Sequence, residues 1–162
     1  MSKVVEILEH RNYNLISKNS NYTLMNDQTN NKHVLIFTCP DNITITLIKA
    51  YIKIMIDTNI NHSVVIYDGK ITPSAKKIIE STELTIELFT NNEMSINIFK
   101  HKYYFPHIKV DDTTKNLLLT KYGPKLPIIL RNDMVVRYLN FKKGDIIKII
   151  RKDDYVSYRM VK

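Results

Sequence analysis

One triplet in this chain has the residue types of a metal-dependent nuclease site. Asp68-Gly69-Lys70 follows a strand-like run, and Asp41 or Asp57 would have to supply a second carboxylate. In such a site the carboxylates hold one or two Mg²⁺ ions, which polarise a phosphate and activate water. Asp-Gly after a strand is also common turn chemistry, and we favour that interpretation. A Mg²⁺-dependent nuclease therefore stays as the third hypothesis.

A second candidate is a helix start that faces an anion. Thr72 places a capping hydroxyl before Pro73 at the first helical position, where the missing N–H costs nothing. The exposed amides of a helix start bind phosphate, but an ordinary helix start with solvated lysines explains the same pattern, and the residues alone favour it. The residues that would face a phosphate backbone here are Lys70, Thr72, Pro73, Ser74, Lys76 and Lys77.

Histidine and cysteine show no metal-binding pattern. The five histidines, at positions 10, 33, 62, 101 and 107, lack zinc spacing, and Cys39 has no thiol partner. We therefore predict no metal, no cofactor and no catalytic residue. His101 and His107 are expected to pack or to form hydrogen bonds.

An aromatic and basic run lies near the middle of the chain. Tyr103, Tyr104 and Phe105 stand beside Lys100 and Lys102, a combination that would stack on exposed bases. Aromatic residues at the start of a strand more often pack into a core, and we favour packing here.

Alternating strands and helices are predicted to position the candidates of the first half. A loop with one irregular strand around residues 22–25 is expected over residues 17–33, which are rich in Asn, Ser and Thr. The alternation of strands and helices indicates that the first half of the chain has an α/β or α+β fold. The sequence predicts helices over 3–12, 46–57 and 74–81, and strands over 33–38, 63–67, 84–89 and 94–98.

The sequence of the second half of the chain predicts a compact sheet with two helices. Asp111 or Asp112 caps a helix that Gly123 ends, and Asn132 or Asp133 opens a shorter one. Strands are expected over 146–151 and 155–161, joined by a tight hairpin at 152–154. No nucleophile, metal cluster or phosphate loop occurs in residues 126–161, so we interpret this segment as a docking module.

Charge divides the chain into two parts. Residues 1–98 carry 9 Lys and Arg against 10 Asp and Glu, whereas residues 99–162 carry 15 against 6. We therefore predict two domains, 1–98 and 99–162, with different surroundings. The basic part indicates nucleic acid, an acidic protein partner or only solubility.

Composition gives hypotheses about setting. Isoleucine occurs 24 times, asparagine 16 times and lysine 19 times against 5 arginines, a bias typical of AT-rich coding sequences. This bias suggests that the sequence comes from a large DNA virus or from a protist with an AT-rich genome. An intracellular setting is expected from the single cysteine, and no membrane span is expected because Lys49 and Lys53 interrupt the longest apolar region.

A series of short motifs occurs in order along the chain: Ile71–Lys76, Ser95–Ile98, His101, Pro106-His107, Leu126-Pro127, Asp133, Val135–Tyr138, Lys143–Asp145, Ile147–Arg151 and Tyr158-Arg159. In this order the motifs resemble a subunit of multisubunit RNA polymerases, called H in archaea and the fifth, shared subunit in eukaryotic nuclear enzymes. Met134 departs from the family, which usually has proline after the aspartate, and the 152–154 hairpin is shorter than in relatives.

The resemblance implies a function and an α+β fold. Residues 1–98 would form a jaw-like α/β domain, resembling restriction endonucleases but inactive, beside downstream double-stranded DNA. Residues 99–162 would form an α+β assembly domain on the largest polymerase subunit, within the polymerase complex. Its interface residues would be Leu126, Pro127, Arg137, Tyr138, Lys143, Gly144, Lys148, Arg151, Tyr158 and Arg159.

Our hypothesis from the sequence is therefore a non-catalytic subunit of a DNA-directed RNA polymerase. Such a subunit resides in the nucleus of a cellular eukaryote, or in the virion or host cytoplasm if the polymerase is viral. The alternative is a free-standing basic nucleic-acid-binding protein, which the charge of residues 99–162 alone would explain.

Overall fold

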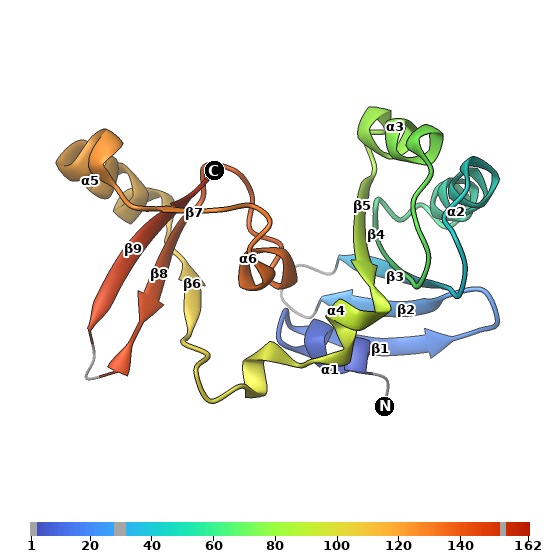
Figure 1. Cartoon of the computed structure of the whole chain (residues 1–162), viewed down its shortest axis with the longest axis horizontal. Coiled ribbons are helices and arrows are strands. Elements are labelled where there is room, and N and C mark those ends of the chain that lie inside the picture. Colours follow the sequence, from blue (N-terminus) through green and yellow to red (C-terminus); the bar gives the residue numbers. More distant parts are fainter. Residues whose placement is uncertain (1–2, 28–31, 153–154) are drawn as a thin grey trace. The chain divides into compact units, whose positions relative to one another are not determined.

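The chain forms two units, each with helices and one mixed sheet, in a computed structural model (Figure 1). The structure describes residues 3–27, 32–152 and 155–162. The first unit is Met1–Asn97 and the second is Ile98–Lys162. The α+β class is thus confirmed. No helix in the described part of the chain combines the length and apolar character needed to cross a membrane.

The first unit is built on a five-stranded sheet in the order β1-β2-β3-β4-β5. The pairs β1/β2 and β2/β3 are antiparallel, whereas β3/β4 and β4/β5 are parallel. The central strands β3 and β4 are apolar and mostly buried, as expected of strands covered on both faces. The strands are β1 Tyr13–Lys18, β2 Thr23–Asp27, β3 His33–Cys39, β4 His62–Tyr67 and β5 Thr85–Thr90.

Four helices accompany this sheet: α1 Lys3–Glu9, α2 Ile45–Asp57, α3 Pro73–Ser81 and α4 Asn91–Ser95. Helices α2 and α3 connect the parallel strands and lie next to each other (Figure 1). The ring of Phe37 stacks on that of Tyr51, with centroids 4.2 Å apart, so β3 and α2 share the core. The predicted helices and the strands at 33–38, 63–67 and 84–89 are confirmed within a few residues.

Two predictions for the first unit are wrong. Residues 94–98 form no strand: α4 covers Asn91–Ser95, because Thr90 and Glu93 form a capping box that starts a helix there. A 3₁₀ turn over Ile98–Lys100 follows. Strand β1 was missed because five of its six residues are exposed and it lacks a continuous apolar run.

The second unit holds a four-stranded sheet in the order β6-β8-β9-β7. Pairing is antiparallel except between β9 and β7, which are parallel. The predicted hairpin strands are confirmed as β8 and β9, while the turn residues 153–154 lie outside the described residues. The elements are β6 His107–Lys109, α5 Asp112–Tyr122, a 3₁₀ turn Gly123–Lys125, β7 Ile128–Ile129, α6 Met134–Tyr138, β8 Ile146–Ile150 and β9 Val156–Val161.

The two faces of this second sheet pack against different helices. On one face Ile147 and Ile149 contact Val136 of α6. On the other face Ile146 packs with Leu118 of α5. The strand alternation therefore sends neighbouring residues of β8 to two separate small cores.

Candidate functional site

The predicted anion-facing residues meet at the exposed start of α3. Thr72 Oγ1 accepts a hydrogen bond of 3.3 Å from the Ala75 amide, and Pro73 occupies the first turn, as predicted. Thr72 is half-buried, while Lys70, Pro73, Ser74, Lys76 and Lys77 are exposed. Lys76 lies 3.9 Å from Glu80 in an exposed pair, which contributes little to stability.

The loop before α3 is held against the loop after β3. The amide of Lys70 donates a 2.6 Å hydrogen bond to Asn42 Oδ1, and Ile43 pairs with Ile71 in an isolated parallel bridge. A Cβ added to Gly69 would lie 2.4 Å from Asn42 Oδ1 and 2.8 Å from its amide nitrogen. Gly69 is not in the left-handed region, so the close approach of Asn42, and not the turn, requires glycine here.

The structure separates Asp57 from Asp68, whereas Asp41 and Asp68 follow the neighbouring parallel strands β3 and β4. Asp57 ends α2, before β4 begins, whereas Asp68 follows the last residue of β4, so the length of that strand separates them. Asp68 Oδ2 accepts a 3.5 Å hydrogen bond from the side chain of Asn91. In the described ranges no three His, Cys, Asp or Glu residues lie together as a possible metal site.

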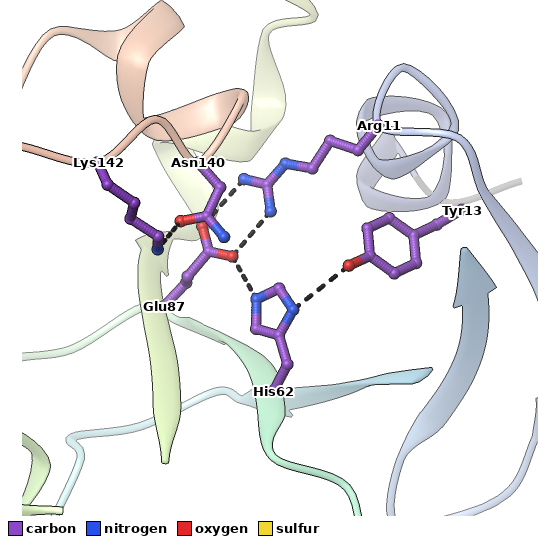
Figure 2. Close-up of polar contacts among 6 residues, drawn as sticks. All are labelled: Arg11, Tyr13, His62, Glu87, Asn140 and Lys142. Carbon is purple, nitrogen blue, oxygen red and sulfur yellow. Dashed lines mark hydrogen bonds and ion pairs between the residues drawn. The ribbon is translucent and has the colours of Figure 1, made fainter. Parts of the chain in front are cut away.

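A buried ionic network inside the first unit was not predicted (Figure 2). The Arg11 guanidinium donates to both carboxylate oxygens of Glu87, at 2.8 and 2.9 Å. His62 Nε2 lies 2.6 Å from Glu87 Oε1, and its Nδ1 lies 3.4 Å from the Tyr13 hydroxyl. Because a carboxylate only accepts, Nε2 of His62 carries the proton in its contact with Glu87.

The electrostatics of this network favour an ionised Glu87. Burial by itself would raise the pKa of Glu87, but the hydrogen bond from His62 and the charge and hydrogen bonds of Arg11 outweigh it and lower the pKa to about 2. Burial raises the pKa of Tyr13. The network links the segment after α1 to β1, β4 and β5, and we interpret it as structural.

The interface residues implied by the family resemblance divide into an interior group and a surface group. Leu126 and Tyr138 are buried, so we reassign them from partner contact to packing within the protein. Pro127, Lys143 and Arg151 are exposed, whereas Arg137, Gly144, Lys148, Tyr158 and Arg159 are half-buried.

The strand register places two of these interface residues on opposite faces of the sheet. Tyr158 is paired with Lys148, and Arg159 with Ile147. Arg159 Nη1 donates to the carbonyl of Ile128 at 3.0 Å, and so bridges β9 to β7. Tyr158 and Lys148 therefore share one surface, and Arg159 belongs to the other.

The turn before β8 depends on Asp145, which belongs to one of the matching motifs but was not predicted as a site residue. Asp145 Oδ2 accepts from the Lys142 amide at 2.8 Å, and Oδ1 lies 2.8 Å from Lys109 Nζ of β6. Gly144 has φ of 86°, the conformation expected from the turn, and its amide donates to the Val161 carbonyl. Asp145 thus joins the turn to β6.

Helix α6 begins where the sequence predicts, although Met134 replaces the usual proline of the family. Asp133 Oδ1 accepts from the amides of Val135 and Val136, at 2.9 and 3.4 Å. The aspartate cap alone therefore defines the start of this short helix.

The aromatic run is mostly internal, as favoured above. Phe105 packs on the β8 core, and the Tyr104 ring lies between Phe99 and His107. His107 Nδ1 donates to the Phe105 carbonyl at 2.6 Å, which confirms a hydrogen-bonding role. Tyr103 alone is well exposed, at 63%, and Lys102 Nζ lies 4.8 Å from its ring centroid.

Comparisons with known proteins agree with the resemblance in the sequence. Residues 96–161 match the family model described as RNA polymerase Rpb5, C-terminal domain. The subunit rpabc1 of DNA-directed RNA polymerases I, II and III from Dictyostelium discoideum is 31% identical over 150 residues, which are 86% of this chain and 76% of that protein. The corresponding subunit from Caenorhabditis briggsae is 31% identical over 145 residues, 84% of this chain and 69% of that protein. The chain therefore belongs to the Rpb5 (RPABC1) family of DNA-directed RNA polymerase subunits.

Proposed function

We propose that this chain assembles into a multisubunit DNA-dependent RNA polymerase as a non-catalytic subunit and takes part in transcription. The observation that carries the proposal is the similarity to polymerase subunits over 86% of the chain. The family match at 96–161 also coincides closely with the second compact unit, Ile98–Lys162. The chain would reside where its polymerase works: the nucleus of a cellular eukaryote, or the virion or host cytoplasm for a virus.

The second unit is proposed to be the assembly domain and to dock on the largest polymerase subunit. Its basic side chains support this role, because two of those in the implied interface, Lys143 and Arg151, are exposed. Charged and polar groups of this kind guide and orient association with an acidic protein surface.

The first unit is proposed to be an inactive, restriction-endonuclease-like jaw domain beside downstream double-stranded DNA. The start of α3 supports a contact with the DNA backbone, since Lys70, Ser74, Lys76 and Lys77 are exposed together. Amides at a helix start and lysine ammonium groups contact phosphate without reading base sequence. We therefore expect any DNA contact by this unit to be independent of sequence.

Affinity purification with mass spectrometry tests the proposal. The tagged chain should return with the two largest polymerase subunits in fixed proportion after nuclease treatment. Recovery without those subunits, together with nucleic-acid binding that weakens steeply with salt, would instead favour the free-standing basic binding protein.

A further inference from the structure

One face of the second sheet is covered by α5 only in part. The register aligns Ile108 of β6, Lys148 of β8 and Tyr158 of β9 across this face, and Ile150 is paired with Val156 beside them. Ile108 is 49% exposed and the other four side chains are half-buried. We name Ile108, Lys148, Ile150, Val156 and Tyr158 the open face. Helix α5 packs at the other end of these strands, around Ile146 (Figure 1).

Lys148 is the single charged residue of the open face. Its neighbours on that face are Ile146 and Ile150 along β8 and Ile108 and Tyr158 across the sheet. Within the described ranges its ammonium forms no hydrogen bond or ion pair. An ammonium group partly withdrawn from water among apolar side chains is stabilised most by a carboxylate.

Three carboxylates of the second unit already have partners. Asp145 pairs with Lys109, Asp111 caps α5 at Thr114, and Asp133 caps α6. Because residues 99–162 carry 15 Lys and Arg against 6 Asp and Glu, this unit has a basic excess. Since the unit is basic and none of these three carboxylates is paired with Lys148, we expect its complementary carboxylate to come from another molecule.

We propose that the open face is the surface by which this subunit docks on the largest polymerase subunit, through a segment that presents a carboxylate to Lys148 and apolar side chains around it. This inference rests on the proposed function and specifies the chemistry of its partner. The apolar side chains favour a protein over nucleic acid, because a phosphate backbone is bound by several cations and polar groups, whereas a protein interface has an apolar centre.

Charge substitution at Lys148 tests the docking surface. The tagged full-length chain is co-expressed with the large polymerase subunits of its own organism and purified after nuclease treatment. Lys148→Glu should reduce the large subunits recovered per chain by about tenfold or more, because two carboxylates would then face each other. Lys148→Met keeps the apolar stem, and should reduce recovery by a smaller factor. Lys49→Glu, an equal charge change on exposed α2, should leave recovery unchanged.

Zero-length carbodiimide cross-linking of the assembled complex identifies the partner group directly. The reagent joins an ammonium and a carboxylate that are already paired, so Lys148 should be found linked to an Asp or Glu of the largest subunit. The cross-link should be absent from the Lys148→Met complex. Thermal unfolding of each purified variant verifies that the sheet is still folded.

The outcomes separate the inference from the proposed function. If the wild-type chain recovers no large subunits, the proposed function itself fails. If the wild-type chain recovers them and folded Lys148→Glu does so equally well, the docking surface is wrong while the function stands. If nuclease treatment abolishes the recovery of the large subunits by the wild-type chain, nucleic acid mediates the association. The proposal that the open face docks directly on a protein is then wrong.

Discussion

Replacing Glu87 by glutamine would remove the carboxylate that pairs with the buried guanidinium of Arg11. In the native network two hydrogen bonds of 2.8 and 2.9 Å join these side chains, and His62 adds a third contact at 2.6 Å. Removing one member of a buried ion pair costs about 3–5 kcal/mol. The pKa of Glu87 is lowered from its ordinary 4.5 to about 2, which corresponds to a stabilisation of the folded protein by about 3 kcal/mol when Glu87 is ionised.

The effect should be confined to the first unit and should depend on pH. A carboxyl group whose folded pKa is depressed stabilises the protein fully above its unfolded pKa, near 4.5, and this stabilisation is lost as the pH falls towards 2. The free energy of unfolding should therefore differ between wild type and Glu87→Gln by about 3 kcal/mol at pH 7. The difference should shrink progressively below pH 4.5.

Hydrogen exchange measured by mass spectrometry in increasing urea is the suitable assay, because two units need not unfold together. Peptides from β4 and β5 report on the network, and peptides from β8 and β9 serve as an internal control. Glu80→Gln removes a carboxylate from an exposed pair and should change stability by less than about 0.5 kcal/mol. A loss below about 1 kcal/mol for Glu87→Gln, or a loss equal at pH 7 and pH 3, would refute the reasoning.

Three further predictions concern the other sites. Gly69→Ala should destabilise the first unit by about 1–3 kcal/mol in the same exchange assay, because the new methyl group would meet backbone atoms; a neutral result would contradict the close approach. Asp145→Ala should cost the second unit about 2–3 kcal/mol, since a backbone donor loses its acceptor, while Lys109→Ala should cost less than about 1 kcal/mol; equal costs in urea denaturation would count against this. Lys77→Gln should lower the salt slope of duplex DNA binding by about one, measured by fluorescence anisotropy, whereas Lys53→Gln should leave it unchanged; identical slopes for both would remove Lys77 from the DNA contact.

Elements with strong local signals were predictable from the sequence. The Thr72-Pro73 start of α3 and the interval from Asp111 to Gly123 that bounds α5 carry their capping chemistry in neighbouring residues, and both form as predicted. Helix α4 also carries a local signal, the Thr90 and Glu93 capping box. The alternation of Met94, Ile96 and Ile98 is typical of a strand and led to the wrong assignment.

Contacts between distant residues were not predictable in the same way. Arg11 and Glu87 are 76 residues apart, and neither residue type nor spacing indicates that they meet. The pairing of Lys148 with Tyr158 depends on the register of β8 and β9, which the sequence did not define because several turns are compatible with residues 152–154. Burial likewise separated Leu126 and Tyr138 from the exposed residues, and a list of motif positions contains no such information.

The most direct test of the account is electron cryomicroscopy of the polymerase purified through a tag on this chain. The account predicts density for the second unit seated on the largest subunit, with Lys148 opposite a carboxylate of that subunit. A map in which this unit contacts no other polypeptide, while the polymerase is otherwise complete, would contradict the central claim.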